Sequence, residues 1–229
     1  AINLGGPTVV SATPERLASL ANRTVRCDAL GGTTGRAQDS RQDRQLTLRL
    51  LNCRKAQHEH ALVVESIRSA LGPLCDELAP QTGPNVVKLR NLQHLWTGIK
   101  GTLRNGVSLL DAARRLQPTP AVAGSPTDRA CRWLQDHENL ARGWYSGTVG
   151  WLQANGEGEL SVLLRCAVLQ GCRADLFAGA GIVSDSDPQA ELGETEIKLH
   201  AMLEAMQEGT GQDEMPMTDA EAGQRTGHS

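Results

Sequence analysis

Two glycines interrupt an apolar segment of this chain and could open its backbone to a ligand. Because Gly179 and Gly181 carry no side chains, the N–H groups around them are accessible to a small anion such as a carboxylate. Further along, Glu191, Glu194 and Lys198 follow one another at spacings of three and four residues, so on a helix they share one face. The combination predicts a site for a negatively charged small molecule and a hard metal ion.

Other side chains that could do chemistry are isolated in the sequence, and each also has an ordinary interpretation. Glu15 follows a predicted strand, where a carboxylate can be held facing a cleft; a surface glutamate in a turn is the alternative. Arg165 lies within an apolar segment, where an unpaired charge is costly. It therefore forms either a structural ion pair or a clamp on a ligand carboxylate. His94 and Tyr145 can bind a ligand or simply pack in the core.

A run of three residues, His58, Glu59 and His60, does not predict a zinc site. Consecutive helical residues point about 100° apart, and no cysteine completes the ligand set. Glu59 alone could offer a carboxylate oxygen to Mg²⁺, which accepts few protein ligands; a solvated helix face is the alternative. Gly32 and Thr33 could offer amides and a hydroxyl to an anion, or belong to a connecting loop.

The composition is that of an ordinary globular protein. Of the 229 residues, 39% are hydrophobic and 21% are charged, and the net charge of −3 gives no reason to expect a nucleic-acid surface. No apolar stretch approaches the roughly 20 residues that span a bilayer. The six cysteines form no CxxC pair, so we expect reduced thiols in a cytoplasmic protein.

Apolar periodicity and turn residues predict alternating groups of strands and helices, typical of α/β or α+β layers in one main domain. Strands are expected at 7–13, 16–20, 24–29, 86–104, 147–153, 160–169 and 174–178. Helices are expected at 40–52, 55–78, 108–116, 127–137 and 188–207, with Ser40 and Thr127 as N-caps of the first and fourth. Segments 30–35 and 118–120 are expected to be loops, and residues 208–229 a disordered tail.

Taken together, these segments resemble the chorismate-utilising enzymes, and among them the isochorismate synthases. The resemblance is carried, in family order, by residues 11–16, 29–33, 55–60, 93–97, 118–121, 143–151, 164–167, 176–183 and 194–198. It covers about residues 7–205, nearly everything before the predicted tail. It implies a layered sandwich of mainly antiparallel sheets flanked by helices.

The resemblance implies a magnesium-dependent isomerase that converts chorismate to isochorismate. Water adds at ring carbon 2 while the hydroxyl at carbon 4 departs. Glu15 would be the general acid on that hydroxyl, and Glu59 and Glu194 would hold Mg²⁺. Glu191 would lie behind them and orient metal-bound water. The residues implied to bind the substrate are Gly32, Thr33, His94, Ala121, Tyr145, Arg165, Gly179, Gly181 and Lys198.

The chain departs from the family pattern at one essential group. The resemblance implies a general-base lysine on a strand well before the segment with Glu15, but the chain begins fourteen residues before Glu15 and none of its lysines lies in that motif. We therefore expect residues 1–207 to be the C-terminal part of a chorismate-binding domain that is incomplete at its N-terminus. The chain alone should be inactive.

Several alternatives stay open at this point. Salicylate synthase, which carries isochorismate on to salicylate and pyruvate, is the nearest one, followed by other chorismate-utilising synthases. A non-catalytic remnant that binds metabolites or another subunit is an alternative of a different class. The product could feed siderophore, salicylate or menaquinone synthesis. The resemblance favours a monomer for the full-length protein, with chorismate as its partner and neither nucleic acid nor membrane.

Overall fold

A computed structural model describes residues 1–3 and 5–208 of the chain. The strands are β1 (Ile2–Asn3), β2 (Thr8–Ser11), β3 (Arg16–Ala21), β4 (Thr24–Gly35), β5 (Cys75–Leu78), β6 (Asn85–Lys88), β7 (Leu92–Leu103), β8 (Thr148–Leu152), β9 (Gly158–Val162), β10 (Cys166–Gln170) and β11 (Arg173–Phe177). The helices are α1 (Ser40–Asn52), α2 (Arg54–Leu71), α3 (Leu109–Leu116), α4 (Pro120–Ala123), α5 (Thr127–His137) and α6 (Pro188–Glu208). The predicted tail, apart from Glu208, lies outside the described residues.

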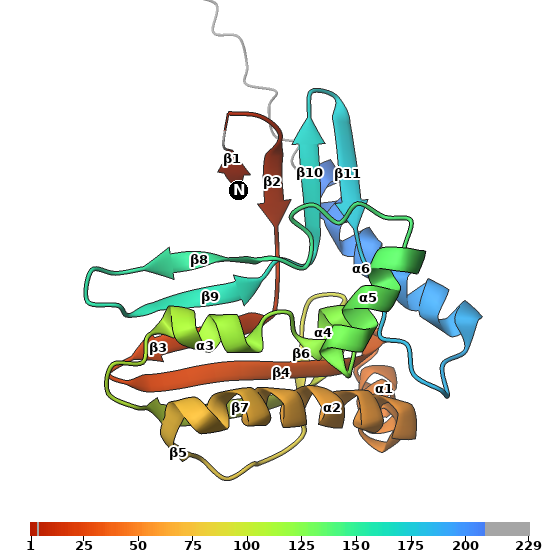
Figure 1. Cartoon of the computed structure of the whole chain (residues 1–229). Coiled ribbons are helices and arrows are strands. Elements are labelled where there is room, and N and C mark those ends of the chain that lie inside the picture. The colour runs from red at the N-terminus through yellow and green to blue at the C-terminus, as the bar shows by residue number, and fades with distance from the viewer. Residues whose placement is uncertain (4, 209–229) are drawn as a thin grey trace, which may run out of the picture.

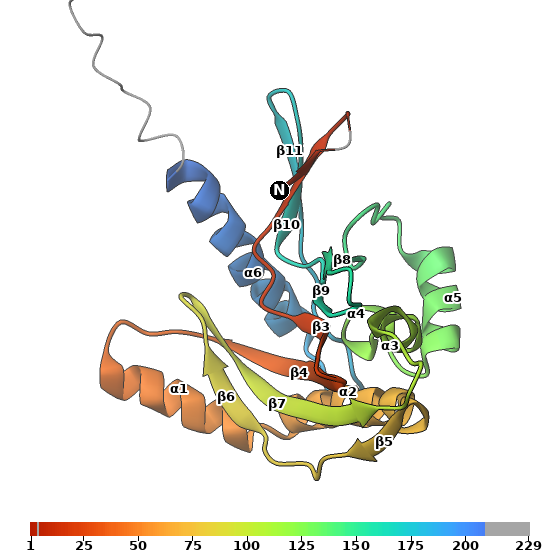
Figure 2. The same cartoon turned by 90° about the vertical axis from the view of Figure 1, so that its left-hand side faces the viewer.

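The strands form two sheets in which every pairing is antiparallel within the described part of the chain. A seven-stranded sheet has the order β5-β7-β4-β3-β9-β8, with β6 also paired to β7. A four-stranded sheet has the order β1-β2-β10-β11 and stands above it in Figure 1. Helix α2 packs on β4 and β7, and α6 runs beside β11 (Figure 2). The prediction of a mixed α/β fold with mainly antiparallel sheets flanked by helices is confirmed.

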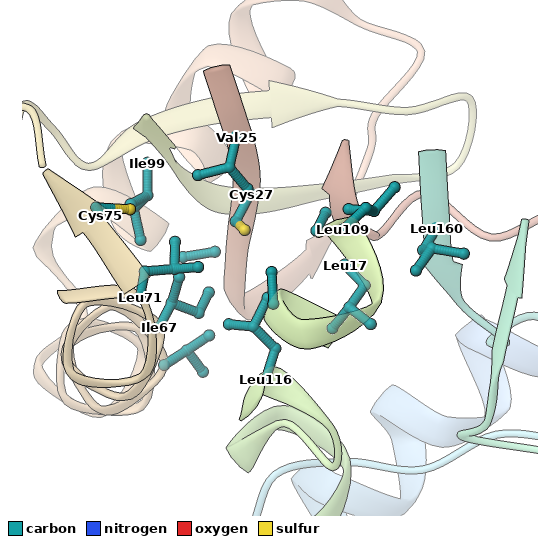
Figure 3. Close-up of a cluster of buried hydrophobic side chains, with 14 of the residues drawn as sticks. Leu17, Val25, Cys27, Ile67, Leu71, Cys75, Ile99, Leu109, Leu116 and Leu160 are labelled. Atoms are coloured by element: carbon teal, nitrogen blue, oxygen red, sulfur yellow. The ribbon is translucent and has the colours of Figure 1, made fainter. Parts of the chain in front are cut away.

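The main hydrophobic core lies where α2 and α3 cover the seven-stranded sheet (Figure 3). On α2, Val63, Ile67 and Leu71 recur every four residues, so they form one apolar stripe, and all three are buried. They meet buried side chains of β4 and β7 such as Val25 and Ile99. This packing fixes α2, and therefore the polar residues on its first turns, relative to the sheet.

Two glycines let the end of β4 approach α2 closely. The pairing of β4 with β7 shifts register between Gly31 and Thr33, and Gly32 has a φ of 65°. A Cβ on Gly32 would lie 2.6 Å from the Cβ of Ala56, and one on Gly31 would lie 2.9 Å from the Cα of His60. Glycine is thus needed at Gly32 for both its backbone conformation and its contact with the helix.

Replacing Gly32 with alanine is expected to lower the free energy of unfolding by about 2 kcal/mol. The left-handed backbone costs a residue with a Cβ roughly 1–2 kcal/mol, and the added methyl must also displace Ala56. Gly35→Ala is the matched control, because nothing lies within 4 Å of a Cβ built there. Urea denaturation of both variants measures the difference. Equal stability of the two would contradict the close contact.

Several predicted element boundaries are wrong. Segment 30–35 is not a loop but continues β4 through the bulge. The helix predicted over 55–78 begins at Arg54 and ends at Leu71, because Gly72 and Pro73 interrupt it, and Cys75–Leu78 becomes β5. The extended segment 86–104 is divided into β6 and β7.

Helix starts also differ from the prediction at three places. Asp39, not Ser40, caps α1, and its side chain accepts a hydrogen bond from the Gln42 N–H at 2.8 Å. Thr127 is the first residue of α5 and not its cap. Pro120 begins the short helix α4, so segment 118–120 is not wholly a loop; a proline fits that first position because its missing N–H has no helical partner there.

The predicted strand 160–169 is in fact two strands in different sheets. It leaves the seven-stranded sheet after Val162 and enters the four-stranded sheet at Cys166. Between them Arg165 takes a φ of 46°, which no regular strand allows. The interpretation of Arg165 as an interior strand residue is therefore wrong, and its true position is at the passage from one sheet to the other.

Candidate functional site

A cavity of about 710 Å³ opens between the seven-stranded sheet, α2, the segment of α4 and α5, and the link from β11 to α6. Of the residues predicted to form the site, only Glu191 is not part of its lining. The others that line it are Glu15, Gly32, Thr33, Glu59, His94, Ala121, Tyr145, Arg165, Gly179, Gly181, Glu194 and Lys198. The fold therefore brings together side chains that are far apart in sequence.

Two neighbouring chain segments that pass between the sheets place Glu15 and Arg165. The link from β2 to β3 runs beside the link from β9 to β10 (Figure 1). The Ala12 N–H donates to the Arg165 carbonyl at 3.0 Å, and the Thr13 hydroxyl donates to the Val162 carbonyl at 2.6 Å. The Val162 N–H in turn donates to the Glu15 carbonyl at 3.0 Å. These backbone contacts bring both functional side chains to the same cavity.

Glu15 is a buried carboxylic acid, with 5% of its surface exposed. Burial raises its pKa from 4.5 to about 7, since the charged form loses its hydration. The positive charge of Arg165 works against this shift, Asp28 adds to it, and Lys198 opposes it. A large fraction of Glu15 therefore carries a proton near neutral pH, as a general acid must.

Arg165 is oriented by a neutral histidine. Its guanidinium lies 3.3 Å from Nε2 of His94, while Nδ1 of His94 lies 3.1 Å from the Thr33 hydroxyl. Burial, together with the charges of Arg165 and Lys198, lowers the pKa of His94 to about 3. Because arginine can only donate, Nε2 must be the acceptor and Nδ1 carries the proton. The remaining N–H groups of Arg165 can face a ligand in the cavity.

The glycine-rich segment after β11 lies against Tyr145 and the first half of α6. A Cβ on Gly179 would lie 2.9 Å from the Tyr145 hydroxyl, and one on Gly181 would lie 3.6 Å from Oε2 of Glu59. Lys198 donates to the Gly179 carbonyl at 2.8 Å. A larger residue at Gly179 would therefore have to displace the Tyr145 hydroxyl, whereas the contact at Gly181 is an ordinary one.

Three glutamates and two lysines meet where α2 approaches α6. Lys198 pairs with Glu194 at 2.6 Å, and Lys55 pairs with Glu59 at 3.2 Å and also with Glu191. Burial raises the pKa of Glu59; Lys55 lowers it in part, and the charges of Glu194 and Glu191 raise it further. We call Glu59, Glu191 and Glu194 the acidic cluster.

Burial lowers the pKa of Lys55, but its contacts with Glu191 and Glu59 outweigh burial and raise it overall, so its amine is charged. The side chain of Glu191 is only 7% exposed, and its carboxylate contacts the ammonium group of Lys55 through Oε1. One oxygen of Glu59, Oε1, is likewise buried and lies 3.2 Å from the same ammonium group. Three largely buried carboxylates that share only two ammonium groups carry excess negative charge, which a further cation can compensate.

The acidic cluster fits a magnesium ion and not a zinc ion. Within residues 1–3 and 5–208, no three His, Cys, Asp or Glu side chains are arranged to ligate one ion by themselves. Mg²⁺ does not need three, because it is commonly held by one or two carboxylates together with waters and substrate oxygens. Glu59 and Glu194 line the cavity, whereas Glu191 is buried and is not part of the lining.

Lys55 pairs with the acidic cluster but is not among the residues that the sequence indicated for this site. It lies in the first turn of α2, and its spacing of four residues from Glu59 is the signal that could have identified the pair. Its contact with Glu191 could not be found this way, because the two residues meet only when α6 packs beside α2. Separately, no helix in the described part of the chain has the length and hydropathy of a membrane span.

Comparison with known proteins identifies the family of the chain. The family model described as "Chorismate binding enzyme" matches residues 1–207. The chain is 40% identical over 206 residues to the isochorismate synthase MenF of Bacillus subtilis (strain 168), which covers 90% of this chain and 44% of that relative. It is 41% identical over 213 residues to the salicylate biosynthesis isochorismate synthase of Pseudomonas aeruginosa, covering 93% and 45%.

The fold is also similar to that of a solved structure. The menaquinone-specific isochorismate synthase MenF of Escherichia coli superimposes on this chain with a TM-score of 0.79 and is 37% identical to it, over 87% of this chain and 46% of that chain. The chain spans about half the length of the curated relatives it matches. Because the family model covers residues 1–207 and the solved relative shares the fold, the chain belongs to the chorismate-binding enzymes.

Proposed function

We propose that this chain carries the substrate site of an isochorismate synthase, an isomerase that converts chorismate to isochorismate. Residues 1–207 would be the C-terminal part of its chorismate-binding domain. The observation that carries the proposal is one cavity lined by a buried acid, Glu15, by two cations, Arg165 and Lys198, and by two further carboxylates. Chorismate is a cyclic dianion with a hydroxyl that must be protonated to leave, so its site needs both kinds of group.

Glu15 acts as the general acid in this proposal. It gives its proton to the hydroxyl that departs from ring carbon 4, while water adds at ring carbon 2. The burial that raises its pKa to about 7 supports this role, because the proton is both present and transferable near neutral pH. Proton transfer from a positioned group typically contributes 10²–10⁴-fold to the rate.

The enolpyruvyl carboxylate is bound by Arg165, Tyr145 and Lys198 together with amides near Gly179 and Gly181. Arg165 is preoriented by His94, so little freedom is lost when it binds a carboxylate. Gly32, Thr33 and His94 form the floor near the ring, and Ala121 contributes to the lining from α4. Glu15, His94 and Lys198 are buried, and limited contact with water strengthens charge interactions at this part of the site.

Magnesium is the cofactor that the acidic cluster supports. Glu59 and Glu194 would hold the ion, and Glu191 would stabilise the arrangement from behind. When bound, Mg²⁺ supplies positive charge that binds the ring carboxylate of chorismate and offsets the repulsion among the glutamates.

The chain by itself should bind chorismate without converting it. Of its four lysines, Lys88 pairs with Asp43 outside the cavity, and Lys55 and Lys198 are paired with carboxylates of the acidic cluster. Lys100 lies on β7 and is exposed. None is a free amine facing the cavity that could take the proton of the attacking water.

Isothermal titration of the chain with chorismate in the presence of Mg²⁺ tests the binding. Arg165→Met is expected to weaken binding roughly 10- to 100-fold, because a charge-assisted hydrogen bond contributes about 1.5–3 kcal/mol. Arg173→Met, which removes an exposed arginine on β11, is the matched control and should leave affinity unchanged. Failure of chorismate to bind would overturn the proposal, and isochorismate formed by the isolated chain would refute the assignment of its lysines.

A chimera tests the reaction itself. In this protein, residues 1–207 replace the matching half of the Bacillus subtilis isochorismate synthase, which then supplies the remaining half of the fold. Given chorismate as sole substrate, the chimera should release isochorismate. Salicylate with pyruvate would assign the chain to a salicylate synthase, and turnover only with ammonia would assign it to an amine-transferring synthase. Light scattering of the same chimera tests whether the protein is a monomer, as expected.

A further inference from the structure

We propose that Lys55 is the internal cation of the acidic cluster: it stabilises the metal-free site and thereby limits the affinity of that site for Mg²⁺. The inference rests on the proposed function only in taking Glu59 and Glu194 as magnesium ligands. It concerns a residue that needs no contact with chorismate.

The position of Lys55 joins two elements that form opposite walls of the cluster. Its ammonium group lies 3.2 Å from Oε1 of Glu59, one turn away on α2, and also contacts the carboxylate of Glu191 on α6. Among the described residues, Lys55 is the cation that ion-pairs with Glu191. Since the Glu191 carboxylate is buried and its contact is with Lys55, its charge depends on Lys55 for compensation.

The charges of the cluster are nearly balanced before any metal binds. Three glutamates contribute −3 and the two lysines contribute +2, which leaves a net charge of −1. Without Lys55 the net charge is −2, and three carboxylates repel one another in a poorly hydrated site. The metal-free protein is therefore stabilised by Lys55, and the attraction for a dication is correspondingly weaker.

Lys55 and the metal would share one carboxylate. Oε1 of Glu59 faces Lys55, whereas Oε2 lies on the side of Gly181, where a Cβ would come within 3.6 Å of it. A dication on the cavity side of Glu59 would thus lie within a few ångströms of the Lys55 ammonium group. At such separations like charges repel by several times the thermal energy even at an effective dielectric constant of about 20.

The decisive measurement is the dissociation constant of Mg²⁺ alone, by isothermal titration of the whole chain without chorismate. Lys55→Met is expected to tighten Mg²⁺ binding by about tenfold or more, and to lower the melting temperature of the metal-free protein by a few degrees. Lys55→Arg keeps the charge and should behave like the original chain. An Mg²⁺ affinity that is unchanged or weaker in Lys55→Met would overturn the inference.

Two further variants keep the result interpretable. If Lys55→Met does not fold without metal, Lys55→Gln offers a neutral polar side chain of similar reach and the same expected direction. Glu59→Gln should abolish most Mg²⁺ binding. If it does not, the magnesium site of the proposed function fails; if it does while Lys55→Gln leaves the affinity unchanged, only the role of Lys55 fails.

Discussion

Glu15→Gln in the chimera is expected to reduce turnover at least about 100-fold while chorismate affinity stays within several-fold. Glutamine has the shape of protonated glutamic acid, so the cavity and its cations are unchanged for the bound ground state. It has no acidic proton to give to the departing hydroxyl. Steady-state kinetics with chorismate, combined with titration of the inactive variant, separates turnover from binding.

The same variant should change the pH profile. Glu15 must be protonated to act, and its pKa is about 7, so turnover of the chimera should fall as pH rises through 7. In Glu15→Gln this descending limb should disappear from the residual rate. Glu65→Gln changes an exposed residue on α2 and is the matched control. It should keep both the original turnover and its decrease as pH rises through 7. Unchanged turnover in Glu15→Gln would refute the role of Glu15.

The parts of the site that a local pattern can describe were predicted from the sequence. Glu191, Glu194 and Lys198 do lie on one helix, and the pairing of Lys198 with Glu194 follows from their spacing of four. The glycines at 179 and 181 mark a segment that lies against polar side chains, and at Gly179 a Cβ would come within 2.9 Å of the Tyr145 hydroxyl. Periodicity and small-residue patterns are properties of a few neighbouring residues, so they can be read without knowing the fold.

The parts that depend on tertiary pairing could not be predicted in this way. The continuous apolar run around Arg165 hides the change of sheet, because each half is buried by a different partner: β3 beside β9, and β2 beside β10. The bulge at Gly32 likewise arises from the register of β4 against β7. Only the resemblance to a family connected Glu15 with these residues before the fold placed them around one cavity.

Glu15→Gln is also expected to stabilise the protein, by about 3 kcal/mol at pH 8. In the unfolded chain Glu15 has its ordinary pKa of 4.5, whereas in the folded chain the value is about 7. Between these two values the folded state binds more protons than the unfolded state, so the free energy of unfolding falls as pH rises from 4.5 to 7. Above pH 7 the free energy of unfolding has fallen by the full amount that the two pKa values imply.

Glutamine carries no charge at any pH, so the variant escapes this loss. The stability difference between Glu15→Gln and the original chain should therefore be about 3 kcal/mol at pH 8 and shrink to less than about 1 kcal/mol below pH 5. Urea denaturation at both pH values measures it, with Glu65→Gln as the control that should show no such pH dependence. A difference that does not grow with pH would mean that Glu15 is already ionised in the folded protein. A gain in stability together with a loss of turnover would instead identify Glu15 as an acid whose burial costs the fold free energy for the sake of chemistry.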